Sequence, residues 1–70
     1  MERTPVTSST LKSVGYDPDT QTLEIEFNHG GIYRYFEVPA EVHEGLMKAS
    51  SLGSYFQANI RDAYQYTKAA

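Results

Sequence analysis

The sequence predicts an α+β domain in which a three-stranded antiparallel meander is followed by two helices, in the order β-β-β-α-α. Three observations lead to this fold class. Residues 22–27 alternate strictly between apolar and polar side chains, which is typical of a half-buried strand. Two glycines at positions 30 and 31 mark a hairpin turn soon after that strand. Beyond Pro39 the apolar residues recur at the spacing of amphipathic helices.

Length and composition limit the chain to one small domain. It has 70 residues, of which 40% are hydrophobic and 13% aromatic, and this length is near the lower limit for folding alone. A core of this size supplies only ~3–5 kcal/mol of net folding stability, so most large apolar side chains are needed for packing. We expect the domain at 9–66, a flexible N-terminus at 1–8 and a C-terminal tail at 67–70.

The charge and the missing residue types exclude several classes of protein. Six Lys and Arg stand against nine Asp and Glu, for a net charge of -3, which argues against tight non-specific binding of nucleic acid and leaves a weak, local RNA contact open. The chain has no cysteine, so it has neither disulfides nor thiolate chemistry. No apolar run approaches the ~20 residues that span a bilayer, and we expect a cytoplasmic protein without membrane contact.

The loop after the second strand decides which way the third strand faces. The first strand is expected at 9–16. A three-residue loop at 29–31 pairs Glu26 with Arg34, whereas a loop one residue shorter or longer buries the Arg34 guanidinium at a cost of several kcal/mol. We therefore predict the three-residue loop. Tyr33 and Tyr35 then face the core, and Ile32, Arg34 and Phe36 face the opposite side.

Two helices are expected after the sheet. Proline suits the first turn of a helix, and Val42 and Leu46 share a stripe of a helix at about 39–49. The second helix is expected at about 53–66, with Phe56 and Ile60 on its apolar stripe and serine N-caps before it.

Five short motifs occur in a characteristic order. They are SVGYD at 13–17, LxIxF at 23–27, YxY at 33–35 followed by VP at 38–39, ASSLGSYF at 49–56, and IRxxY at 60–64. Together they resemble the KTSC domain, a short module found alone in bacterial proteins and at the C-terminus of some lysyl-tRNA synthetases. The resemblance covers nearly the whole chain. It implies a small module of unassigned activity, and the association with a synthetase suggests RNA, tRNA in particular, as a ligand.

The best candidate for an RNA or anion site is the start of the second helix. Free N–H groups near Ser51, Gly53 and Ser54 would meet an anion there, with Arg61 beside them. Lys12 and Lys48 would add to such a basic surface. The plainer interpretation makes Arg61 a solvated surface charge. Tyr33 and Tyr35 can stack bases in principle, but the packing argument favours a place in the core.

A second candidate is a protein interface on the uncovered sheet face. Ile32 and Phe36 would form an apolar patch there, flanked by Arg34. Such patches more often mark protein contacts than nucleotide platforms. A homodimer that seals this face, or a larger docking partner, is therefore the alternative to RNA.

No residue pattern indicates catalysis, a metal or a cofactor. His29 and His43 are not at metal-ligand spacing. The DPDTQT segment at 17–22 lacks the glycine that a calcium loop needs. Neither a phosphate-binding glycine loop nor a nucleophile elbow is present. A chain of 70 residues rarely encloses a pocket of ~300 Å³ or more, so we expect a non-enzymatic binding module with no cofactor.

Overall fold

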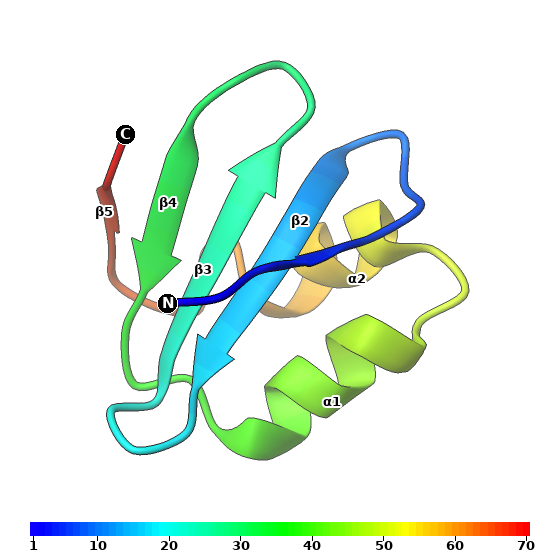
Figure 1. Cartoon of the computed structure of the whole chain (residues 1–70). Coiled ribbons are helices and arrows are strands. Elements are labelled where there is room, and N and C mark those ends of the chain that lie inside the picture. The colour runs from blue at the N-terminus through cyan, green and yellow to red at the C-terminus, as the bar shows by residue number, and fades with distance from the viewer.

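Two helices cover one face of a five-stranded antiparallel sheet (Figure 1). The computed structural model describes all residues from 1 to 70. The strand order in the sheet follows the sequence. The elements are β1 (Thr4–Pro5), β2 (Leu11–Asp17), β3 (Thr22–Phe27), β4 (Ile32–Tyr35), α1 (Ala40–Lys48), α2 (Leu52–Asn59) and β5 (Tyr66–Lys68). Neither helix has the length and apolar character needed to cross a membrane.

The core lies between the sheet and the two helices. Strand β3 alternates as expected, with three buried apolar side chains on the helix side and two glutamates on the other face. Its apolar side chains belong to one core cluster with residues of β2, β4, α1 and α2. The ten buried core residues are Leu11, Val14, Leu23, Ile25, Phe27, Tyr35, Val38, Leu46, Phe56 and Ile60. The α+β class is thus as predicted.

The β3–β4 hairpin has a three-residue loop, but the loop lies one residue earlier than expected. The Gly30 N–H donates to the Phe27 carbonyl and the Phe27 N–H donates to the Gly31 carbonyl, so the loop is 28–30. Gly30 has a φ of 110°, the positive value that closes such a hairpin after a type I turn. The register moves by two residues, so Arg34 lies opposite Glu24 instead of Glu26. A shift of two keeps every side chain on its predicted face.

The sheet has two strands more than the three that the sequence predicts. One lies in the expected N-terminal tail, and the other begins at the last residue of the expected second helix and continues into the expected C-terminal tail. Thr4–Pro5 pairs with β2, and Tyr66–Lys68 pairs with β4. Each covers an edge of the central meander, where unpaired backbone groups would otherwise face solvent. The residues before β1 approach Gly15 so closely that a Cβ there would lie 2.6 Å from the Glu2 carbonyl oxygen.

The second helix is shorter than the expected span of 53–66. It ends at Asn59, and its C-cap Ile60 has left the helical conformation. The N–H groups of Ile60 and Arg61 both donate to the Phe56 carbonyl, so the helix ends in a wider, π-type turn. The chain then reverses so that β5 can pair with β4. The apolar residues beyond Ile60 therefore belong to a connection and not to a helical stripe.

Candidate functional site

A groove of about 500 Å³ runs between the β3–β4 hairpin, β5 and the end of α2, on the helix side of the sheet. Aromatic rings form its floor and wall, and polar side chains surround them. The lining residues are Thr10, Phe27, His29, Tyr33, Tyr35, Phe56, Gln57, Arg61, Asp62 and Tyr66. The volume is within the ~300–1,000 Å³ typical of ligand sites, which is more than we expected of so short a chain.

The rings of this aromatic groove form one continuous cluster. Phe27 lies edge-on to both Tyr33 and Phe56, with centroids 5.6 and 5.3 Å away. Tyr66 contacts Tyr33 and Tyr35 at 5.9 and 5.4 Å. Phe27, Tyr35 and Phe56 are buried, Tyr33 is half-buried, and Tyr66 is 57% exposed. The buried rings fix the shape of the groove, and the other two offer ring surface to a ligand.

Hydroxyl and charged groups surround the deepest tyrosine. Burial raises the pKa of Tyr35 to about 12, and the neighbouring Tyr66, Tyr33 and Asp62 add to this rise while Arg61 opposes it. The phenol of Tyr35 is therefore neutral at physiological pH and can donate or accept a hydrogen bond. The groove thus combines ring surfaces with several hydrogen-bonding groups and one charge of each sign.

Half of the basic residues are already neutralised on the open face of the sheet, the face that carries no helix. Arg3, Lys12 and Arg34 each lie within 4.0 Å of a glutamate carboxylate, which leaves Lys48, Arg61 and Lys68 of the six. Arg61 lines the aromatic groove. Lys68 lies opposite Tyr33 in the β4–β5 pair, and a Cβ on Gly31 would be 3.7 Å from its Cε. Two cations free of carboxylate partners therefore flank the groove.

The structure does not bring the predicted anion site together. Arg61 follows the C-terminal end of α2, whose eight residues span about 12 Å, so it lies far from the helix start. There the Ser51 hydroxyl already accepts the Ser54 N–H. Gly53 is buried against Thr10, where a Cβ would lie 2.8 Å from the hydroxyl oxygen. The N–H groups at this helix start are thus largely occupied or covered.

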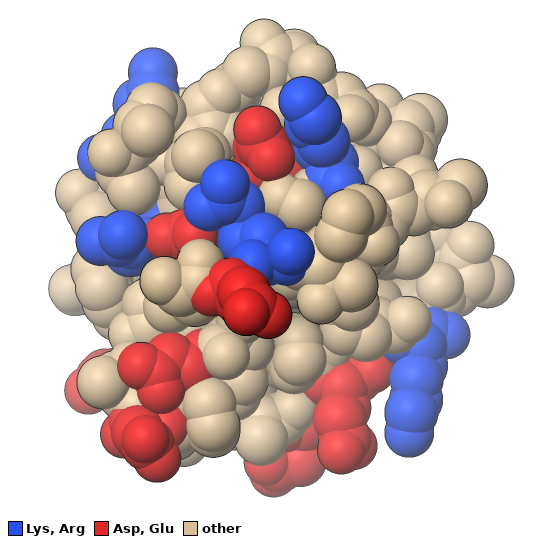
Figure 2. All heavy atoms as spheres, in the orientation of Figure 1, with Lys and Arg blue, Asp and Glu red and all other residues tan.

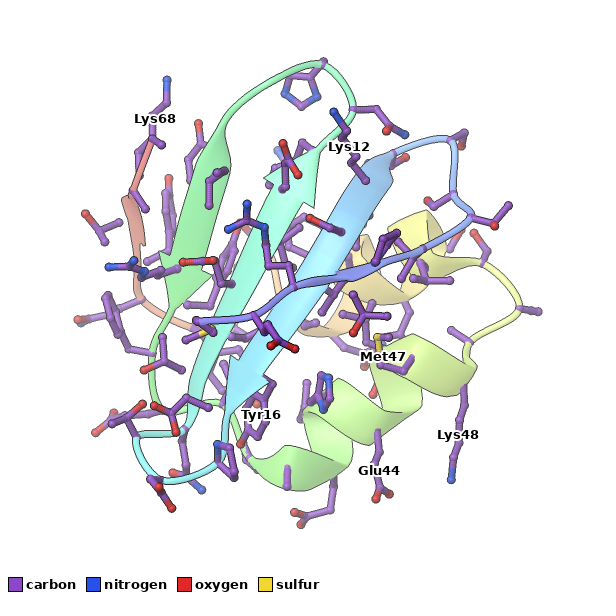
Figure 3. The ribbon with its side chains drawn as sticks, viewed as in Figure 1. Lys12, Tyr16, Glu44, Met47, Lys48 and Lys68 are labelled. Carbon is purple, nitrogen blue, oxygen red and sulfur yellow. The ribbon has the colours of Figure 1, made fainter.

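The two predicted lysines lie on separate parts of the molecule. Lys12 stands at the start of β2, 4.0 Å from a Glu26 carboxylate oxygen. Lys48 extends from the end of α1, while Lys68 lies at the opposite corner of the view (Figure 3). Lys12 and Lys48 therefore do not form one basic surface with Arg61.

The open face is not the bare apolar patch that the interface hypothesis requires. Figure 2 shows basic and acidic side chains intermixed over its strands. Glu24, only 3% exposed, accepts hydrogen bonds from Arg3 and Arg34. Ile32 shares this face, but Phe36, at the end of β4, lines a separate hollow with Ala63 and Tyr64. The Arg3 side chain of the N-terminal segment reaches this face and bonds to Glu24 beside Arg34.

Sequence reasoning missed Tyr66 and Asp62 as groove residues, and Lys68 beside the groove. It placed Tyr66 at the end of a helix and Lys68 in a tail. Two signals pointed elsewhere, since Asn59 is a common helix-ending residue and the YTK triplet at 66–68 begins with two residues that favour strands. Tyr33 and Tyr35 face the core as predicted, and they also line the groove.

Comparisons with known proteins agree with these motifs and this fold. The family description for the KTSC domain matches residues 7–64. The chain belongs to the KTSC domain family. A crystal structure of a KTSC domain protein from Yersinia pestis superposes with a TM-score of 0.96 at 40% identity, covering 99% of this chain and 97% of that one.

Relatives of this KTSC domain include both small proteins and parts of large ones. An uncharacterized protein of Stutzerimonas stutzeri is 52% identical over 56 residues, which cover 80% of this chain and 79% of that protein. A lysine–tRNA ligase of Nostoc sp. is 47% identical over 58 residues, which cover 83% of this chain. The match spans only 10% of the ligase, so the shared part is one module of that protein.

Proposed function

We propose that this KTSC domain is a non-enzymatic RNA-binding module, with tRNA as the first candidate, and that the aromatic groove is its contact surface. The observation that carries the proposal is the pairing of accessible rings with the two unneutralised cations. Aromatic rings bind bases by stacking, worth ~1–3 kcal/mol per base. In this proposal, Arg61, which lines the groove, and Lys68, which lies opposite Tyr33, neutralise phosphates. The lysine–tRNA ligases that carry a related module add support.

The charge distribution makes the proposed contact local and weak. A net charge of -3 repels the phosphate backbone as a whole, and Asp62 in the groove repels it at one point. We therefore expect one small contact and no extended basic surface. The interface alternative has less support, because the ion pairs of Glu24 with Arg3 and Arg34 make this face charged where an apolar patch was expected.

The proposal is tested by fluorescence anisotropy of labelled tRNA at several salt concentrations. Two neutralised phosphates give a slope of log affinity against log salt of about -1 to -2. Replacing Arg61 and Lys68 by alanine should weaken binding and flatten this slope. Lys48→Ala is the matched control, because it removes a cation that lies away from the groove. A Lys48 effect as large as that of the double variant would contradict the proposal.

A further inference from the structure

The accessible part of the aromatic groove is small. The exposed His29 ring lines one side of the groove. Among the phenylalanines and tyrosines, Phe27, Tyr35 and Phe56 are buried, so a ligand meets mainly the rings of Tyr33 and Tyr66. Their centroids are 5.9 Å apart and their planes are inclined by 56°. A planar group that enters must lie against one of these ring faces. In a double helix the faces of the bases are covered by their neighbours and are not available for such a contact.

The free cations are also too few for duplex recognition. Domains that bind double-stranded RNA contact two successive minor grooves and the phosphates between them, over ~16 base pairs. This domain measures 28 × 25 × 22 Å, and only Arg61 and Lys68 flank the groove. Asp62 further restricts the path of a backbone past Arg61. Two cations can neutralise one or two phosphates next to a stacked base.

We infer that the aromatic groove takes an unpaired base from a single-stranded segment of RNA, with the adjacent phosphates at Arg61 and Lys68, and discriminates against duplex RNA. This inference rests on the proposed RNA-binding function and names the part of the RNA that is bound. Tyr33 and Tyr66 supply the stacking surface. The hydroxyls of the groove tyrosines and the Asp62 carboxylate surround the base with hydrogen-bonding groups.

The test compares an oligouridine strand with the duplex that it forms with oligoadenosine, using the intact chain. Loss of one stacked base corresponds to about 5- to 150-fold in affinity, and we expect the single strand to bind tighter by a factor in that range. Tyr66→Ala should remove most of this preference, whereas Tyr66→Phe should retain it. Phe36→Ala is the matched control, since Phe36 is an exposed aromatic residue outside the groove.

The outcomes separate the inference from the function on which it rests. Equal or tighter binding of the duplex would overturn the single-strand inference and leave RNA binding intact. Failure of both RNAs to bind would overturn the proposed function as well. A single-strand preference that survives Tyr66→Ala would overturn the assignment to the groove. Because Tyr66→Ala can also loosen β5, Arg61→Gln provides a second variant outside any strand, and we expect it to weaken single-strand binding.

Discussion

Arg3 and Glu24 meet at the centre of the open sheet face, where the Arg3 Nη1 donates a hydrogen bond of 2.5 Å to the Glu24 Oε2. The other carboxylate oxygen of Glu24 accepts from the Arg34 Nε at 2.8 Å. A carboxylate that is almost fully buried thus has both oxygens bonded to guanidinium groups. The contact also ties the N-terminal segment to the middle strand, although the two are 21 residues apart in the sequence.

The first prediction is that Glu24 makes stability fall in acid. Burial alone raises its pKa, but the hydrogen bonds from Arg34 and Arg3 outweigh burial and hold the pKa below the usual 4.5. The unfolded chain therefore binds a proton more readily than the folded one. The stabilisation is complete above pH 4.5 and declines as the pH falls through the folded pKa. Urea unfolding across this range should show a shallower decline for Glu24→Gln than for the natural chain. Equal declines would contradict this assignment.

A second prediction concerns the two arginines as a unit. Each is partly exposed, at 28% and 49% of the side chain, so losing one leaves Glu24 paired with the other. Replacing both Arg3 and Arg34 by methionine leaves a buried carboxylate without a partner, and we expect a loss of about 3–5 kcal/mol in the free energy of unfolding. Adding Glu24→Leu to this double variant should recover most of the loss. If the double variant costs no more than the two single ones combined, the three charges are not coupled.

The third prediction is that Gly45→Ala destabilises the natural chain but stabilises a chain that lacks the Tyr55 ring. A Cβ there would lie 2.7 Å from the Tyr55 Cζ, so Gly45 lets the Tyr55 ring of α2 rest against α1. In the natural chain Gly45→Ala should cost about 1–3 kcal/mol from overpacking, although alanine favours a helix. In a Tyr55→Ala background the same change should stabilise by about 1 kcal/mol. Thermal unfolding of the natural chain, the two single variants and the double variant measures the coupling energy between Gly45 and Tyr55. If Gly45→Ala stabilises the natural chain, the Tyr55 ring does not pack against Gly45.

The fourth prediction is that Gly15→Ala detaches the N-terminal segment. The new Cβ would collide with the Glu2 backbone, which cannot yield without moving β1. We expect faster exchange of the Val6 amide, whose N–H donates to the Lys12 carbonyl of β2. A chain that lacks residues 1–4 serves as the control, because the same substitution should have little effect there. Unchanged exchange in the full chain would show that β1 tolerates the added methyl group.

The sequence predicts the elements in which apolar and polar residues alternate with a clear period. The alternation in β3 fixes its buried face, and charge excludes Arg34 from the core. The exact partner of Arg34 is not predictable in the same way, because Glu24 and Glu26 lie on the same face and both offer a carboxylate. The hydrogen bond from the Gly30 N–H to the Phe27 carbonyl sets the register. Gly30 and Gly31 both have a positive φ, and a sequence with two adjacent glycines does not reveal which one closes the turn.

The groove is harder to predict than the core, because its residues come from distant parts of the chain. Tyr33, Arg61 and Tyr66 meet only once β5 has paired with β4. That pairing satisfies the backbone hydrogen-bonding groups at the edge of β4. The three residues of β5 are too few to show the alternation of a strand in the sequence. Arg61 lines the groove, whereas the serines and the glycine predicted beside it lie at the other end of α2.

The measurement that tests the central claim most directly is an amide NMR titration of the labelled domain with the oligouridine strand. We predict shifts that fall off with added salt and are confined to residues around the groove, with the largest changes near Tyr33, Arg61 and Tyr66. Amides of the open face, such as those of Gly15 and Glu24, should stay unchanged. Shifts centred on the open face or on the start of α2, or no shifts at low salt, would contradict the claim that the aromatic groove binds RNA.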